Sequence, residues 1–369
     1  MEKQKSKLHP FGHGGDLQTA AEQAGMAAEE LLDFSASINP LGPPVGLYDF
    51  LGAQLPKIAA YPDPECRKLL SAIASRYQTN HSLVAGNGAG ELIYLVMRAL
   101  PAGKVLIPVP TFALYEQAAQ AVSREISYHI LQQDKSFALD MPAFCAAVSR
   151  ERPVLTVLCN PNNPTGTLLS REDILTVAAA CAEHGGYLLL DEAFLEFCPD
   201  WQHRTLLVNT PPNVLVLCSM TKMYAIPGLR LGFLAAPVEF ADSIKKLRDP
   251  WSVNTLAQLA GEYVLRNHEF INQTVALVSR LAQKLTCQLS SFPDVRVWPP
   301  AANYLFMEVL AMPSFVLQKE LLAEKVLVRD CANFHGLSPR FIRVAVRTEA
   351  ENELLVAAFR RILILAEEK

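Results

Sequence analysis

The stretch Ser219-Met-Thr-Lys222-Met-Tyr-Ala-Ile-Pro-Gly-Leu-Arg230-Leu-Gly232 follows an apolar run at residues 214–218, a pattern that predicts a strand, an exposed loop and a second apolar segment. Lys222 has few charged neighbours, and desolvation lowers the pKa of such an amine, so that it can form a Schiff base with an aldehyde. Ser219 and Arg230 flank it with donors that suit a phosphate. The combination indicates a site for pyridoxal phosphate, although a single lysine is ordinarily interpreted as a surface residue.

The composition is typical of a globular protein with an ample core. Half of the 369 residues are hydrophobic and 19% are charged, and this length predicts roughly two domains. The net charge of −4, with no basic run beyond Lys3-Lys5-Lys7, argues against nucleic acid as a partner. No stretch resembles a signal peptide or a membrane span, and the eight scattered cysteines lack metal-ligand spacing. We therefore expect a cytoplasmic protein with reduced cysteines, no metal site and no membrane association.

Apolar strands alternate with helices through the middle of the chain, which predicts an α/β fold with a mostly parallel sheet. One strand enters the glycine-rich turn Gly88-Ala89-Gly90, whose amides at a helix start can bind an anion. Phe112, Asn163 and Asp191 each follow a predicted strand, at the end where ligands gather in parallel sheets. A buried Asp191 needs a cation or a raised pKa, and a protonated pyridine nitrogen is such a cation. Plainer interpretations are a structural turn at Gly88-Ala89-Gly90, a core aromatic at Phe112, and a helix cap or salt-bridge partner at Asp191.

The chain divides into three predicted parts. We expect an N-terminal arm at residues 1–45 that packs with the small domain, a large domain at residues 46–245, and a small domain of mixed α and β structure at residues 246–369. Within the arm, residues 17–32 are expected to form a helix, and the following proline- and glycine-rich segment is expected to be extended.

Several polar and aromatic residues outside the large domain's strands are further candidates. Two glycines after His13 let backbone approach a ligand closely, and Tyr61 precedes a rigid proline turn on an exposed loop. Arg343 and Arg347 are four residues apart on a predicted strand, so they should lie on one face. Surface salt bridges are the default interpretation of such arginines, and binding of a ligand with two anionic groups is the alternative.

Taken together, these motifs resemble the class I/II aminotransferase superfamily of fold-type I pyridoxal-phosphate enzymes. The resemblance covers nearly the whole chain, and its motifs occur in the family's order: Gly88-Ala-Gly90, Phe112, Asn163-Pro-Thr-Gly, Asp191-Glu-Ala-Phe, Ser219-x-x-Lys222, Arg230 and Arg343.

The resemblance implies a role for each position. Lys222 would bind the cofactor's aldehyde and move protons, and Asp191 would keep the pyridine ring protonated, which makes it an electron sink. Asn163 would bind the phenolic oxygen and Phe112 would stack on the ring. The cofactor phosphate would be held by Gly88, Ala89, Gly90, Ser219 and Arg230, and by Tyr61 of a neighbouring subunit, which implies a homodimer with shared active sites. Arg343 would bind the substrate carboxylate, and His13, Gly14 and Arg329 are candidates for the substrate's phosphate.

Within the superfamily the resemblance is strongest to the decarboxylases of O-phospho-L-threonine in cobalamin biosynthesis. Four segments carry it: His13-Gly-Gly, Asp33-Phe-Ser-Ala-Ser-Ile-Asn-Pro-Leu-Gly, Pro250-Trp-Ser-Val-Asn and Arg329-Asp-Cys-Ala-Asn-Phe. Histidinol-phosphate aminotransferases are the alternative. Phe194 departs from the aminotransferase pattern, because many relatives carry a tyrosine there. A ligand-sensing domain of a transcription regulator is disfavoured, since little chain precedes residue 33.

Overall fold

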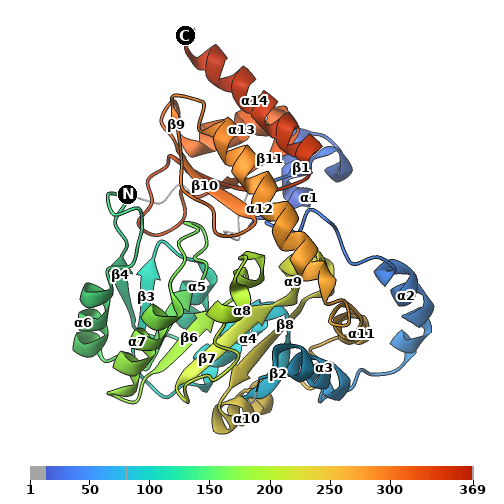
Figure 1. Ribbon diagram of the computed structural model, residues 1–369, viewed down its shortest axis with the longest axis vertical. Coiled ribbons are helices and arrows are strands. Elements are labelled where there is room, and N and C mark those ends of the chain that lie inside the picture. Colours follow the sequence, from blue (N-terminus) through green and yellow to red (C-terminus); the bar gives the residue numbers. More distant parts are fainter. Residues whose placement is uncertain (1–13, 80, 368–369) are drawn as a thin grey trace.

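The computed structural model describes residues 14–79 and 81–367. Its centre is a seven-stranded sheet in the order β2-β8-β7-β6-β5-β3-β4 (Figure 1). Strand β8 is antiparallel to its neighbours β2 and β7, and the remaining pairs are parallel. The predicted mostly parallel sheet is therefore confirmed. The strands are β2 (Ser82–Asn87), β3 (Val105–Val109), β4 (Ile126–Ile130), β5 (Leu155–Cys159), β6 (Tyr187–Asp191), β7 (Val214–Ser219) and β8 (Leu231–Ala236).

Helices cover both faces of this sheet, because its inner strands are apolar on both sides. In β6, Leu188 and Leu190 enter one buried cluster and Leu189 enters the other, as the alternation of a strand requires. The first cluster includes residues of α3 (Arg67–Tyr77), α6 (Met141–Glu151), α7 (Arg171–Ala182) and α11 (Thr255–Val264); the second includes residues of α4 (Gly88–Ala99), α5 (Leu114–Ala121) and α10 (Val238–Leu247). The other helices of this part are α2 (Leu47–Gln54), α8 (Trp201–Arg204) and α9 (Met220–Met223).

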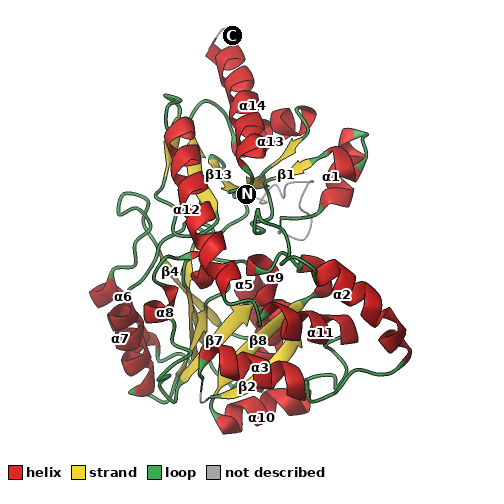
Figure 2. Cartoon of the chain, turned by 45° about the vertical axis from the view of Figure 1, so that its right-hand side comes forward, coloured by secondary structure: helices red, strands yellow, loops and turns green. Residues whose placement is uncertain are grey.

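A second, antiparallel sheet in the order β12-β13-β10-β9 lies above the first and packs against the C-terminal helices (Figure 2). Its strands are β9 (Val295–Val297), β10 (Tyr304–Val309), β12 (Arg329–Asp330) and β13 (Phe341–Ala345), and the helices are α12 (Glu269–Leu289), α13 (Ser314–Ala323) and α14 (Glu349–Glu367). The N-terminal segment joins this part: β1 (Leu32–Asp33) pairs with β11 (Val326–Leu327), and Ala20 and Ala21 of α1 (Leu17–Ala24) are buried with Leu322 of α13.

One predicted helix is shorter in the structure. The predicted helix over residues 17–32 ends at Ala24, because Gly25 adopts a left-handed conformation that caps it, and a short 3-10 turn follows. The chain after residue 245 does not pack with the second sheet at once. Phe270 and Ile271 at the start of α12 lie in the first core, and Leu285 near its end lies in the core of the second sheet. The domain boundary at residue 245 stays a prediction.

Candidate active site

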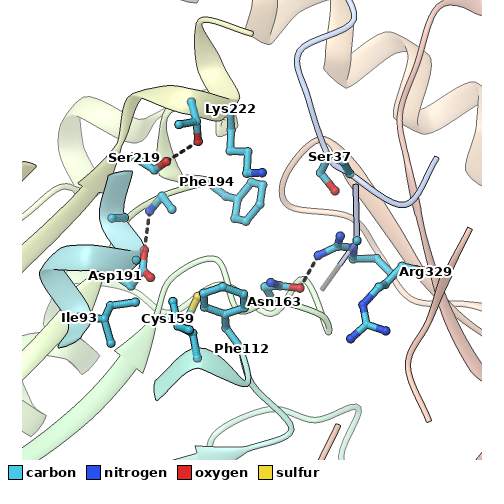
Figure 3. A pocket seen from close by; sticks show the side chains of 18 of the residues that line it. Ser37, Ile93, Phe112, Cys159, Asn163, Asp191, Phe194, Ser219, Lys222 and Arg329 are labelled. Carbon is cyan, nitrogen blue, oxygen red and sulfur yellow. Dashed lines mark hydrogen bonds between the residues drawn. The ribbon is translucent and has the colours of Figure 1, made fainter. Parts of the chain in front are cut away.

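A cavity of about 320 Å³ lies where the carboxyl ends of β5, β6 and β7 face the second sheet (Figure 3). Side chains and backbone from both sheets and from the N-terminal segment line it. Most of the residues that the sequence predicts for a site are brought together here: Gly14, Ala89, Gly90, Phe112, Asn163, Asp191, Ser219, Lys222, Arg230, Arg329 and Arg343. The sequence motifs therefore converge on a single cavity, although they come from segments more than 300 residues apart.

Two of the described residues with a predicted site role do not line the cavity. Gly88 lies just beneath it, where a Cβ atom would be 2.4 Å from Nη2 of Arg230. Tyr61 is 80% exposed, and its ring packs against Trp251 with 4.6 Å between centroids. Its predicted role is in a neighbouring subunit and stays a prediction. His13 lies outside the described residues.

Lys222 lies in α9, immediately after β7, and its amine points into the cavity (Figure 3). Burial, followed by the charges of Arg343 and Arg230, lowers the pKa of Lys222 to about 8. The backbone of this turn is tied to the N-terminal segment by Asn39. Its N–H donates to the Lys222 carbonyl at 3.2 Å, and its Nδ2 donates to the Met223 carbonyl at 2.7 Å and to Thr274 Oγ1 at 2.8 Å. The lysine is therefore held by a segment some 180 residues away in the chain.

Asp191 ends β6 and is buried at the bottom of the cavity. Its Oδ2 accepts a hydrogen bond from the Tyr115 hydroxyl at 2.6 Å, and its Oδ1 accepts one from the Ala193 backbone N–H at 2.9 Å. Burial raises the pKa of Asp191, while these two donors oppose the rise. Within residues 14–79 and 81–367, no basic side chain forms a salt bridge with this carboxylate, so the cavity offers a place for a cation beside it.

Arg343 is a buried cation on the opposite wall. One of its terminal nitrogens donates to Asn163 Oδ1 and the other to the Ser35 carbonyl at 2.7 Å, while its Nε has no partner among the described residues. Burial lowers the pKa of Arg343. A buried guanidinium whose bonds go to neutral oxygens is costly, and an anionic ligand would offset that cost.

Arg329 (Figure 3) is a second buried cation, and it lies directly opposite Arg343 in the pairing of β12 with β13. Its Nη2 donates to Asn333 Oδ1 at 2.7 Å, and its guanidinium lies 4.9 Å from the centre of the Phe334 ring. Burial, as the largest cause, lowers the pKa of Arg329 to about 10. The two arginines give this wall a positive potential, which is suited to a ligand with two anionic groups.

The opposite end of the cavity can hold a further anion. Helix α4 begins at Gly88, and the backbone amides of its first turn, together with Arg230 and the Ser219 hydroxyl, offer a set of donors for a phosphate. The Ser219 and Thr221 hydroxyls lie 2.7 Å apart, so the two share one hydrogen bond.

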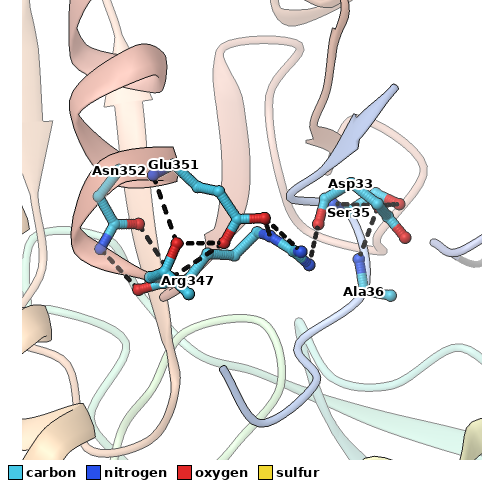
Figure 4. Close-up of polar contacts among 7 residues, drawn as sticks. Asp33, Ser35, Ala36, Arg347, Glu351 and Asn352 are labelled. Carbon is cyan, nitrogen blue, oxygen red and sulfur yellow. Dashed lines mark hydrogen bonds and ion pairs between the residues drawn. The ribbon is translucent and has the colours of Figure 1, made fainter. Parts of the chain in front are cut away.

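The N-terminal segment at residues 33–37 contributes Ser35, Ala36 and Ser37 to the cavity wall, and the sequence motifs predict a site role for none of these three. A polar network holds this segment in place (Figure 4). Arg347 donates to the Asp33 carbonyl at 3.1 Å and to Glu351, and the Asp33 carboxylate accepts from the Ser35 hydroxyl at 2.6 Å. Arg343 and Arg347 thus donate to the same segment, although the strand predicted to carry both of them ends at Ala345. The other lining residues without a predicted site role are Ile93, Leu114, Cys159, Ala193, Phe194, Thr221 and Phe334.

Across the described residues, no cluster of three or more His, Cys, Asp or Glu side chains could hold a metal ion. Likewise, none of the helices in the described part of the chain combines the length and the apolar character needed to cross a membrane.

The class of protein follows from comparison with known proteins. The sequence model for aminotransferase class I and II matches residues 48–359, so the chain belongs to the class I and II aminotransferase family. The threonine-phosphate decarboxylase of Salmonella typhimurium is 38% identical over 96% of this chain and 98% of its own length. The predicted family and fold are therefore confirmed.

Solved structures of two relatives share most of this architecture. The histidinol-phosphate aminotransferase from Clostridium acetobutylicum is 28% identical, with a TM-score of 0.84, and the match covers 90% of this chain and 99% of that chain. The L-threonine-O-3-phosphate decarboxylase from Porphyromonas gingivalis is 27% identical, with a TM-score of 0.79, and the match covers 89% of this chain and 98% of that chain.

Proposed function

We propose that this protein decarboxylates O-phospho-L-threonine to (R)-1-amino-2-propanol O-phosphate in cobalamin biosynthesis, in the cytoplasm and with pyridoxal 5′-phosphate as its cofactor. The observation that carries this proposal is the pair of buried arginines, Arg329 and Arg343, in the same cavity as Lys222 and Asp191. A substrate with a carboxylate and a phosphate would pair with both cations. The similarity to a threonine-phosphate decarboxylase over nearly the whole chain supports the same reaction.

The cavity residues fit pyridoxal phosphate. Two observations support the fit: Asp191 is a buried carboxylate that forms no salt bridge within the described residues, and Gly88 leaves room for Arg230 where any side chain would collide with it. When bound, the cofactor supplies an electron-withdrawing ring that accepts the electron pair of the bond broken at the substrate's α-carbon. We assign its aldehyde to Lys222, its ring nitrogen to Asp191, its ring face to Phe112, its phenolic oxygen to Asn163, and its phosphate to Ser219, Arg230, Ala89 and Gly90.

The chain's own groups have two tasks in this reaction. Arg343 binds the substrate carboxylate and so fixes the orientation of the bond to the α-carbon, since only a bond perpendicular to the ring is broken. After the carboxylate leaves as carbon dioxide, the same carbon needs a proton. The amine of Lys222, with its pKa of about 8, is poised to carry that proton at neutral pH. Arg329 and Gly14, with His13, would bind the substrate's phosphate.

The alternative function is transamination of a phosphorylated amine or amino acid of the histidinol-phosphate type. It is favoured by the structural similarity to a histidinol-phosphate aminotransferase. Both reactions use the same cofactor site, and they differ in which bond of the α-carbon is held perpendicular to the ring.

An assay without a keto acid separates these functions. We expect the purified protein, supplied with pyridoxal phosphate, to release carbon dioxide from O-phospho-L-threonine, and the Lys222→Ala variant to release none above background. The variant should also lack the visible absorption of the lysine-bound cofactor. Turnover of histidinol phosphate with 2-oxoglutarate, without carbon dioxide release from phosphothreonine, would establish the alternative.

We further propose a homodimer with shared active sites. Large apolar side chains are exposed near one another in sequence between residues 41 and 61, among them Val45 at 96% and Tyr48 at 74%. Tyr61 and Trp251 add an exposed aromatic pair. Such a surface is suited to burial against a second copy of the chain.

A further inference from the structure

Tyr115 is a fully buried residue in the first turn of α5, behind the cavity wall. Its hydroxyl donates to Asp191 Oδ2 at 2.6 Å, which is the shortest bond that the structure gives this carboxylate. Its ring meets the edge of Phe112 with 5.6 Å between centroids. Phe112 lines the cavity and Tyr115 does not, so Tyr115 can influence a bound molecule only through its neighbours.

The position of Tyr115 matters because Asp191 is buried. Burial favours the neutral acid, and each donor to its oxygens favours the carboxylate instead. Each oxygen accepts one hydrogen bond in the structure and keeps a second acceptor position. A ring nitrogen beside Asp191 would share one proton with it. Without the Tyr115 hydroxyl, the carboxylate would hold that proton more tightly, and the ring would become neutral.

We infer that Tyr115 is a positioning residue that keeps Asp191 ionised and oriented, so that the shared proton stays on the cofactor's ring nitrogen. The inference rests on the proposed function, because it requires pyridoxal phosphate in the cavity. It does not depend on whether the reaction is decarboxylation or transamination, since both need a protonated ring.

The chain offers a matched control. Tyr77 is also buried, and its hydroxyl donates to Glu196 Oε1 at 2.7 Å, which is the same kind of bond, although Tyr77 lies in the first buried cluster and Tyr115 in the second. Glu196 does not line the cavity. Tyr115→Phe and Tyr77→Phe each remove one hydroxyl and leave the ring in place. A general loss of packing or stability should therefore affect both variants, and loss of support for Asp191 should affect only Tyr115→Phe.

Two measurements on these variants test the inference without relying on activity. The first is the dissociation constant of pyridoxal phosphate from the apoproteins by equilibrium dialysis, which we expect to rise at least about threefold in Tyr115→Phe, because a hydrogen bond to a charged group is lost. The second is the ¹⁵N NMR shift of ring-labelled cofactor. It should report a protonated nitrogen in the wild type and in Tyr77→Phe, and a shift toward the neutral form in Tyr115→Phe.

Steady-state kinetics add a third readout. We expect kcat to fall in Tyr115→Phe with KM for the substrate little changed, because Arg329 and Arg343 are intact. In an Asp191→Asn background, Tyr115→Phe should have no further effect on cofactor affinity. If Tyr115→Phe fails to fold, a fluorinated tyrosine at position 115, which donates more strongly, should leave the ring nitrogen protonated and tighten cofactor binding.

The outcomes separate the inference from the function on which it rests. A wild type that binds pyridoxal phosphate with a protonated ring, beside a Tyr115→Phe variant with the same affinity and the same ¹⁵N shift, overturns the inference alone. An affinity for pyridoxal phosphate that is unchanged with the fluorinated tyrosine does the same. A wild type that binds no pyridoxal phosphate overturns the proposed function, and the inference with it.

Discussion

Lys222 shares its cavity with Arg230 and Arg343, and both guanidinium groups disfavour a third positive charge. Burial acts in the same direction and is the larger cause, so the pKa of Lys222 falls from 10.5 to about 8. The unfolded chain keeps this lysine protonated up to the higher value. Between the two values folding therefore releases a proton, and the contribution of Lys222 to the free energy of unfolding of the apoprotein rises with pH across that interval.

We predict that the apoprotein takes up pyridoxal phosphate with a pH midpoint near the Lys222 pKa of about 8, because only the neutral amine reacts with an aldehyde. Arg343→Met should move this midpoint upward, since removal of a neighbouring cation favours the ammonium form. The measurement is the rate at which visible absorbance appears as a function of pH. Arg340→Met, which removes an exposed arginine just before the same strand, should leave the midpoint where it is. An unmoved midpoint in Arg343→Met would contradict the assigned cause.

At the scale of elements, the start of α4 is shaped by the absence of a side chain. Gly88 has a φ of +78°, and a Cβ there would lie 2.4 Å from Nη2 of Arg230. An alanine would therefore both strain the backbone and displace the guanidinium that faces the helix amides. Gly185 has nearly the same φ, +77°, and a Cβ there would meet no atom within 4 Å beyond its own chain neighbours.

Gly88→Ala should weaken binding of pyridoxal phosphate by about tenfold, as expected for the loss of one charge-assisted phosphate contact. Gly88→Ala and Gly185→Ala should each lower the free energy of unfolding by ~1–2 kcal/mol through backbone strain. Gly185→Ala should nevertheless leave cofactor affinity unchanged. Thermal unfolding and equilibrium dialysis measure the two quantities. Equal losses of cofactor affinity in both variants would mean that strain, and not the position of Arg230, is responsible.

The sequence is informative about elements when the signal is local. Apolar runs and the turns after them place Asn163, Asp191 and Lys222 at the same edge of a sheet, where the structure has them. It is less informative when a contact joins distant segments. The segment at residues 33–37 reads only as an extended arm, because its bonds go to Arg343 and Arg347, more than 300 residues away. In the sequence, Tyr115 is one residue of a predicted helix, and its hydrogen bond to Asp191 becomes evident only in the folded structure.

At the scale of the whole molecule, the cavity lies between two sheets and is lined in part by the N-terminal segment, so no single part of the chain contains it. Hydrophobic periodicity indicates which face of an element is buried, but not which other element covers that face. It therefore could not predict that α12 packs into both cores or that Phe334 lies on the cavity wall. Periodicity likewise could not show that Tyr61 is exposed and lies outside the cavity of its own chain.

The proposed homodimer predicts complementation between two inactive variants. If Tyr61 serves the partner's cavity, a hybrid of one Lys222→Ala chain and one Tyr61→Ala chain has one site with both residues intact and one with neither. Each variant alone should be nearly inactive. An equal mixture, unfolded and refolded together, should recover up to about a quarter of wild-type carbon dioxide release, since half of the dimers are hybrids and each has one intact site.

If Tyr61 served its own chain, every site of every hybrid would lack one of the two residues, and mixing would restore nothing. A sedimentation measurement of the mixture shows whether dimers have formed. Absence of complementation in a dimeric sample would contradict shared active sites. A wild-type protein that sediments as a monomer would contradict the homodimer itself.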